Sequence, residues 1–201
     1  MHYRAVGNRC AVCFADLEIP IPEEQCLSIL KEKGFSRVDI DIVSLARSRV
    51  GVSRYRRSAQ LNEAPETFDC SSFIKWLYGQ KGIWLPRRSI QQREFGVAVQ
   101  KENLRAGDIV FVSGRIDYYI DNPADGVGHV GIATENYTVI HAANTKSGLI
   151  ESSFEEFTDE DSLRGIRRLV PNGRDVYTFI TPLEREIEWS DDIRWIILQN
   201  L

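Results

Sequence analysis

At 201 residues, the chain has room for one domain of ordinary size plus extensions and is too short for two full domains. A content of 43% hydrophobic and 27% charged residues is typical of a soluble globular protein and argues against a disordered or fibrous one. The formal net charge of −4, with no Lys/Arg run, offers no basic surface to a polyanion, so DNA and RNA are not expected partners.

The four cysteines, Cys10, Cys13, Cys26 and Cys70, are too few and too concentrated near the N-terminus to form the framework of a disulfide-stapled fold. Cys10 and Cys13 have the spacing of half a zinc site, but no second Cys-x-x-Cys or His pair follows them. We therefore expect structural thiols there, with a disulfide as the alternative. We expect no metal and no organic cofactor.

The first two-fifths of the chain have helical and loop patterns. Residues 23–33 and 39–48 have the apolar spacing of short amphipathic helices, and a glycine follows each of them. A polar loop is predicted over residues 54–67. A third helix is predicted to begin at Cys70, with an apolar stripe within residues 73–78 that favours burial.

From residue 108 onward the pattern changes to short segments rich in β-branched and aromatic residues. Residues 108–112, 129–134 and 137–142 are predicted strands, and 149–152 and 165–170 are later candidates. Helices followed by closely spaced strands indicate an α+β domain, in which helices pack against an antiparallel sheet of about five to six strands.

We assign residues 1–38 to an N-terminal extension, 39–172 to the main domain and 173–201 to a C-terminal extension that packs on that domain. The C-terminal extension contains a strand-like segment at 176–180 and an apolar cluster at 195–198. No apolar run approaches the roughly 18 to 20 residues needed to cross a bilayer, so we predict no transmembrane segment.

Residues suited to thiol chemistry stand where these elements could bring them together. Cys70 is the only cysteine at a predicted helix N-terminus, where unpaired backbone N–H groups and the helix dipole stabilise a thiolate. A nucleophilic thiol also needs a base, and histidine suits that task near neutral pH. His2 lies at the terminus, which leaves His129 and His141 in the strand region.

The turn between the two histidine-bearing strands decides whether the two rings can meet. A three-residue loop over 134–136 would set His129 directly opposite His141 on one face of the sheet. A two-residue turn at Glu135 and Asn136 would place the rings on opposite faces. Asn136 tolerates the left-handed conformation and is compatible with the longer loop. Which of the two histidines faces the sulfur does not follow from the spacing.

Two neighbouring features suggest how substrate could reach these residues. Gly128 and Gly131 flank the first histidine and would leave room for a substrate backbone beside it. The segment 114–128 is longer than a minimal connection, and we expect it to form a rim of the substrate groove or, alternatively, a solvated surface loop.

Five short motifs resemble, in order and spacing, those of NlpC/P60 peptidases. They are Phe-Asp-Cys-Ser-Ser-Phe at 68–73, Leu-Pro-Arg-Arg-Ser at 85–89 with Gln92, Ala-Gly-Asp-Ile-Val-Phe at 106–111, Gly-His-Val-Gly-Ile at 128–132 and Val-Ile-His-Ala at 139–142. The resemblance extends over about residues 42–152, roughly half the chain. It implies a papain-like fold with the nucleophile at a helix N-terminus. The usual reaction in that family cleaves an amide in peptidoglycan stem peptides, often between D-glutamate and a diamino acid.

The resemblance also implies roles for individual residues. Cys70 is the expected nucleophile, His129 the general base and His141 the residue that orients the base. Tyr55 loosely matches a tyrosine that lies in the active site of many members, although the proline before it and the glycines after it are missing here.

Four further residues are expected near the site. Asp69 could cap the helix, and Ser71 could lend its backbone N–H to an oxyanion hole; alternatively, both are ordinary helix-start residues. Arg87, together with Arg88, could bind carboxylates of a stem peptide or lie on the plain surface.

We therefore predict a cysteine endopeptidase that hydrolyses a peptidoglycan-derived peptide through a thioester acyl-enzyme. The alternatives are a papain-like amidase or acyltransferase, and a non-catalytic wall-binding module. Charged residues interrupt the N-terminal region, so no signal peptide is visible. The location is left open between the cytoplasm, export by a non-standard route and the mature form of a cell-wall enzyme. No oligomeric state follows from the sequence.

Overall fold

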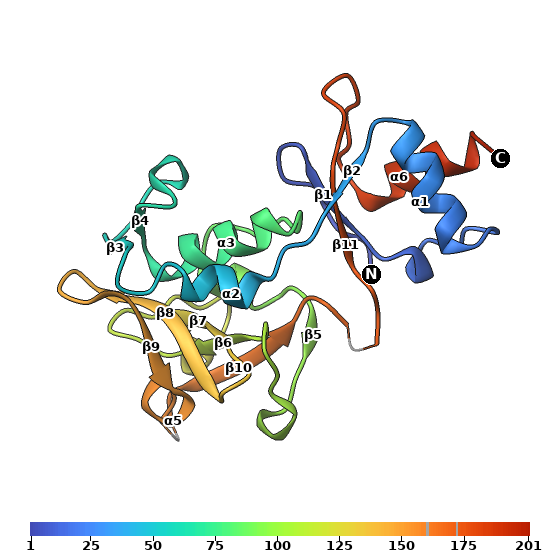
Figure 1. Ribbon diagram of the computed structural model, residues 1–201. Helices are drawn as coiled ribbons and strands as arrows, with labels where there is room; N and C mark the ends of the chain where they lie inside the picture. Colours follow the sequence, from blue (N-terminus) through green and yellow to red (C-terminus); the bar gives the residue numbers. More distant parts are fainter. Residues whose placement is uncertain (160, 172) are drawn as a thin grey trace. The chain divides into compact units, whose positions relative to one another are not determined.

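The computed structural model describes residues 1–159, 161–171 and 173–201 (Figure 1). It comprises two compact units. The first contains Met1–Asp41, Tyr78–Trp84 and Asn172–Leu201, and the second contains Ile42–Leu77 and Leu85–Pro171. The sequence-based division had treated the two ends of the chain as separate extensions. In the structure they belong to one unit, because strands from both ends pair with each other.

The first unit is a small three-stranded antiparallel sheet with two helices. Strand β11 (Tyr177–Ile180) lies between β1 (Arg9–Val12) and β2 (Ser36–Val38), and the helices are α1 (Glu23–Glu32) and α6 (Ser190–Leu198). The helix predicted at 23–33 and the strand predicted at 176–180 are confirmed, whereas the apolar cluster at 195–198 is helical. The core of this unit includes Cys10, Cys26, Leu30, Phe179 and Ile197.

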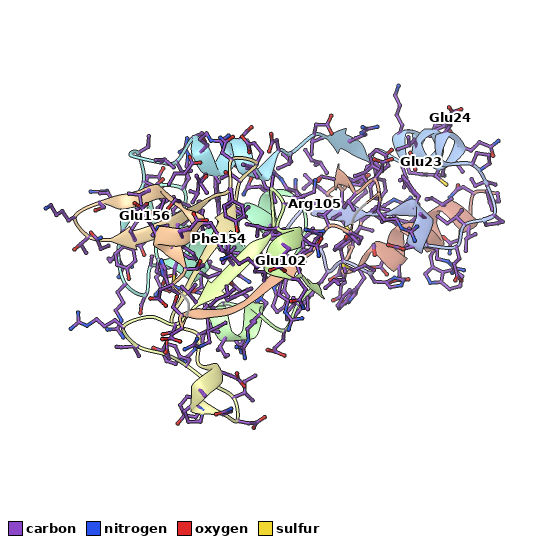
Figure 2. The ribbon with its side chains drawn as sticks, turned by 90° about the horizontal axis from the view of Figure 1, so that it is seen from below. Glu23, Glu24, Glu102, Arg105, Phe154 and Glu156 are labelled. Atoms are coloured by element: carbon purple, nitrogen blue, oxygen red, sulfur yellow. The ribbon has the colours of Figure 1, made fainter. Side chains whose placement is uncertain are left out.

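Acidic residues open helix α1, where the helix dipole favours negative charge. Figure 2 labels Glu23 and Glu24 in this first turn. The carboxylate of Glu23 also accepts a hydrogen bond from the phenol of Tyr177, which ties α1 to the central strand β11. Cys10, Cys13 and Cys26 are buried in this unit as free thiols.

The second unit contains the predicted antiparallel sheet. Within the described residues it has six strands, in the order β5-β10-β6-β7-β8-β9. Their bounds are β5 (Val97–Ala98), β6 (Ile109–Val112), β7 (His129–Ala133), β8 (Thr138–Asn144), β9 (Gly148–Ser153) and β10 (Leu163–Arg168). The predicted α+β class is confirmed, and the five strands predicted in this region are present.

Helices and a two-stranded ribbon complete the second unit. The helices are α2 (Ile42–Arg47), α3 (Cys70–Gln80), which begins here, α4 (Ser89–Gln92) and α5 (Phe154–Phe157), and the ribbon is the parallel pair β3 (Arg54–Tyr55) and β4 (Thr67–Phe68). Figure 1 shows α2 and α3 along one side of the sheet. The helix predicted at 39–48 is confirmed, but it starts at Ile42. No helix in the described part of the chain is long and apolar enough to span a membrane.

Both faces of the sheet are covered, so its central strand β6 is buried at all four positions. Side chains on one face form a cluster with helix α5; this cluster includes Val110, Ala133, Val139 and Phe154. The alternation of side chains along β7 and β8 places His129 and His141 on this same face. Helix α3 contributes three fully buried apolar side chains to the unit, Phe73, Ile74 and Leu77.

A buried ion pair joins the turn before β6 to the end of β10. The Arg168 guanidinium donates to both carboxylate oxygens of Asp108, over 2.7 and 2.6 Å, and Asp108 is only 1% exposed. The backbone N–H of Arg105 donates to the same carboxylate at 2.8 Å. Removing one partner of such a pair leaves the other charge buried without compensation.

We predict that Asp108→Ala lowers the free energy of unfolding by about 3 to 5 kcal/mol, measured by urea denaturation at pH 7. Glu94→Ala is the matched control, because Glu94 is half exposed and contacts Arg93 over 3.6 Å. Its effect should stay below about 1 kcal/mol. Equal destabilisation by the two substitutions would contradict a special contribution of the buried pair.

Candidate active site

A groove of about 1000 Å³ opens on the second unit. All eight residues that the sequence placed at or near the site line it: Tyr55, Asp69, Cys70, Ser71, Arg87, Arg88, His129 and His141. Because these residues come from β3, the start of α3, the segment before α4, β7 and β8, only the tertiary fold brings them together.

Cys70 is the first residue of helix α3, and the residues around it hold the helix start in place. The carboxylate of Asp69 accepts the backbone N–H of Ser72 at 2.8 Å, and the Ser72 hydroxyl accepts the backbone N–H of Asp69 at 2.9 Å. This reciprocal arrangement satisfies two N–H groups that a helix start otherwise leaves unpaired. Asp69 therefore caps the helix that carries the thiol.

The hairpin between β7 and β8 differs from both turns considered from the sequence. Ile132 pairs with Ile140 and Ala133 with Val139, so the three-residue loop runs from Glu135 to Tyr137. The pairing is displaced by two residues from the register in which His129 would lie directly opposite His141, so neither of the two registers considered from the sequence is formed. Tyr137, and not Asn136, adopts the left-handed conformation, with φ 57°.

A displacement by two residues leaves both histidines on the same face of the sheet, since side chains alternate with a period of two. The rings are diagonal neighbours, and Nε2 of His129 lies 2.8 Å from Nδ1 of His141. This hydrogen bond occupies Nε2 of His129. Nδ1 is the only ring nitrogen of His129 left to exchange a proton with a thiol.

The sulfur of Cys70 lies beside the same strand. Backbone N–H groups of Ser71 and Val130 hydrogen-bond to it and lower its pKa, and Arg87 acts in the same direction. Burial and the nearby charge of Asp69 outweigh them and raise the pKa of Cys70 to about 12. The helix start thus lowers the pKa of the Cys70 thiol, as the sequence led us to expect. Burial raises this pKa by more than the helix start lowers it.

Burial also keeps the two imidazoles neutral. It lowers the pKa of His129 to about 4. It lowers that of His141 to about 3, with a further contribution from the charge of His129. The raised pKa of the thiol and the lowered pKa values of both rings favour the neutral form of all three groups, so proton transfer from sulfur to Nδ1 of His129 would have to accompany attack on a substrate.

Two residues that the sequence analysis did not identify complete the surroundings of the histidines. The Phe157 ring lies 5.4 Å from the His129 ring and 4.7 Å from the His141 ring, and it shields both from water. The hydroxyl of Ser152 lies 3.3 Å from Nε2 of His141. Ser152 falls in a predicted strand, but its position next to His141 follows only from the β8–β9 register.

Tyr55 reaches the groove because β3 pairs with β4, where Tyr55 stands opposite Phe68, two residues before Cys70. Burial and the nearby Cys70 and Asp69 raise the pKa of the Tyr55 phenol. Both observations place this side chain close to the sulfur. A direct role of Tyr55 toward substrate stays a prediction.

Arg87 is held by groups of the protein itself. Its guanidinium donates to Asp69 Oδ1 and Oδ2 at 3.1 and 2.5 Å, to the Ser71 hydroxyl at 2.9 Å and to the Ala59 carbonyl at 2.7 Å. Buried Gln92 supports the same turn by donating to the Ser71 and Pro86 carbonyls. In this structure Arg87 holds the cap of α3, and contact of Arg87 with a substrate carboxylate stays a prediction.

The segment 114–128 supplies part of the groove wall, including Gly114, Arg115, Ile116 and Tyr118. The chain itself fills the space that a side chain would take at Gly128 and Gly131, and the expectation that they leave room for a substrate backbone stays a prediction. A Cβ on Gly128 would lie 2.4 Å from the Asp117 carboxylate, and one on Gly131 would lie 2.4 Å from Val139. Across the described residues, no three His, Cys, Asp or Glu side chains gather as a metal site would require.

Comparison with known proteins gives a consistent family signal. The model of the NlpC/P60 family matches residues 52–168. The chain is similar to a probable endopeptidase of Corynebacterium glutamicum, with 37% identity over 61% of this chain and 52% of that protein. It is also similar to the murein DD-endopeptidase/murein LD-carboxypeptidase MepS of Escherichia coli K12, with 35% identity over 51% of this chain and 48% of that protein.

A solved structure supports the same relationship. An NlpC/P60 family protein from Bacillus cereus is similar with a TM-score of 0.54 and 26% identity, over 65% of this chain and 40% of that one. The chain spans about half the length of the curated relatives described above.

The lowered pKa values of the histidines predict a pH-dependent stability. Between pH 6.5 and 4 the unfolded chain binds protons on His129 and His141 that the folded chain does not, so stability falls as the pH falls. The thermal midpoint of the protein should decrease across this range. In His129→Asn/His141→Asn the decrease should be smaller, and an unchanged slope would contradict the neutral state of the buried rings.

Accessibility predicts which thiol reacts first. Cys70 is partly exposed in the groove, whereas Cys10, Cys13 and Cys26 are at most 2% exposed. Iodoacetamide at pH 7.5 should label Cys70 at least about tenfold faster than the others, as read by peptide mass mapping. His129→Ala should slow this labelling because the proton acceptor is gone. Comparable rates for all four thiols would contradict the structure of the groove.

Proposed function

The chain belongs to the NlpC/P60 family, and on that premise we propose that it is a cysteine endopeptidase acting on peptidoglycan stem peptides. The bond we assign is an amide of the D-glutamyl–diamino-acid type, cleaved through a thioester acyl-enzyme. One observation carries the proposal: a thiol at the tip of α3 lies beside a strand whose histidine is hydrogen-bonded to a second histidine, all in one groove.

The reaction would begin at the protonated thiol. Nδ1 of His129 takes the proton while the Cys70 sulfur attacks the carbonyl carbon, and the carbonyl oxygen becomes an oxyanion. His129 then gives the proton to the leaving amine as the carbon–nitrogen bond breaks, leaving a thioester on Cys70.

Water completes the cycle by the same route. Nδ1 of His129 takes a proton from a water molecule whose oxygen attacks the thioester carbon, and the carbon–sulfur bond breaks. The proton returns to the sulfur, so the enzyme ends in its starting state. The backbone N–H of Ser71, already directed at the sulfur, is the donor we assign to the oxyanion.

The charges along the groove suit a peptide that carries both carboxylates and amines. Arg57, Arg88 and Arg115 stand among the basic lining residues, and Glu156 and Asp159 among the acidic ones. The guanidinium of Arg88 lies 5.2 Å from the centre of the Tyr118 ring, so this wall combines an aromatic surface with a cation. Stem peptides of peptidoglycan present both kinds of charged group.

We expect the purified protein to cleave muropeptides, with the cut identified by mass spectrometry of the fragments. Cys70→Ala and His129→Ala should each lower the turnover rate at least about a thousandfold while the thermal midpoint stays near that of the unchanged protein. Cys26→Ala is the matched control, since Cys26 is a buried thiol outside the groove and its removal should leave turnover intact.

Each other outcome has a defined meaning. Full activity of Cys70→Ala would refute the proposed nucleophile. Formation of an adduct with an added amine, in place of free acid, would identify an acyltransferase. Absence of any product together with slow labelling of Cys70 would identify a wall-binding module without catalysis.

A further inference from the structure

Three side chains on neighbouring strands form a line that leads away from the sulfur. His129 on β7 bonds to His141 on β8 over 2.8 Å, and His141 bonds in turn to Ser152 on β9 over 3.3 Å. The register of β8 and β9 pairs Val139 with Ser152, so Ser152 is on the face that carries His141. All three side chains line the groove.

The hydrogen-bond pattern of a neutral histidine constrains the pattern of its neighbour. Each neutral ring has one N–H donor and one bare nitrogen, and the bond made by one nitrogen decides the state of the other. To accept the thiol proton, Nδ1 of His129 must be bare. Its Nε2 then carries the hydrogen and donates to Nδ1 of His141, so His141 must carry its own hydrogen on Nε2, facing Ser152.

We propose that Ser152 is a positioning residue of this site, whose hydroxyl oxygen accepts the Nε2 hydrogen of His141 and so selects the tautomers of both rings. This inference rests on the proposed function and extends it by one residue. Unlike the two imidazoles, the Ser152 hydroxyl does not titrate. By accepting the Nε2 hydrogen of His141, it favours the tautomers in which Nδ1 of His129 is bare and can act as a base.

Removing the hydroxyl would leave the Nε2–H of His141 without this acceptor. The opposite tautomer of His141 then becomes competitive, with its hydrogen on Nδ1 and directed at Nε2 of His129. In that state the hydrogen of His129 moves to Nδ1, and this nitrogen can no longer accept the proton of Cys70. Chemistry is impaired, whereas the groove walls that bind the peptide are unchanged.

The test compares Ser152→Ala with Ser152→Thr, which keeps the hydroxyl, and with Ser147→Ala. Ser147 is an exposed serine in the β8–β9 hairpin that does not line the groove, and it serves as the matched control. Ser152→Ala should lower kcat about five- to tenfold, the effect of losing one ordinary hydrogen bond, with KM changed less than about twofold. Ser152→Thr and Ser147→Ala should stay within about twofold of the unchanged protein.

A second readout does not require activity. In the unchanged protein, ¹⁵N NMR of the histidine rings should find the hydrogen on Nε2 of both His129 and His141. In Ser152→Ala a fraction should move to Nδ1, and Ser152→Thr should restore the original state. A purely structural effect of the substitution would lower the thermal midpoint without this redistribution.

The two readouts separate the possible failures. If Ser152→Ala keeps both the tautomers and kcat of the unchanged protein, the inference about Ser152 is overturned while the proposed peptidase stands. If the unchanged protein has the expected tautomers but cleaves no muropeptide, the proposed function fails and the ordering role of Ser152 in the histidine line survives. A spectrum with the hydrogen of His141 on Nδ1 in the unchanged protein would overturn the inference directly.

Discussion

The hydrogen bond between His129 and His141 is the interaction on which the rest of the site depends. It exists because the loop from Glu135 to Tyr137 has three residues, which keeps both rings on one face of the sheet. One residue fewer would send one ring to the opposite face. Tyr137 accepts a left-handed backbone to close this loop, a conformation that costs about 1 kcal/mol or more for a residue other than glycine.

Burial sets the chemical state of the site. Phe157 covers both imidazoles, and the thiol lies deep enough for its pKa to rise despite the helix start and the backbone donors of Ser71 and Val130. These shifts favour the neutral form of all three groups in the free protein. Reactivity then depends on the geometry of the hydrogen bonds along which a proton moves from one group to the next. Uncharged residues such as Ser152 are important because they fix this geometry.

The groove is assembled from segments that are distant in the sequence, and a few polar contacts hold them in register. Arg87 connects Asp69, Ser71 and the Ala59 carbonyl, so the cap of α3 and the loop after β3 are held together. Because Gly128 has no side chain, the rest of the segment 114–128 can lie close to it and form a wall of the groove. These contacts shape the groove, whereas Cys70 and His129 are the residues that would react in it.

The sequence by itself determined the α+β class, most of the sheet strands and eight of the residues that line the groove, because local periodicity and short motifs record which side chains are buried or reactive. It did not determine the hairpin register, the grouping of the two chain ends in one unit, or the places of Phe157 and Ser152. Those features depend on how strands pair with one another, and a shift of one residue in the pairing moves a side chain to the opposite face of the sheet. The sequence also could not show whether burial or the helix dipole has the larger effect on the pKa of Cys70, since the extent of burial is a property of the packed structure alone.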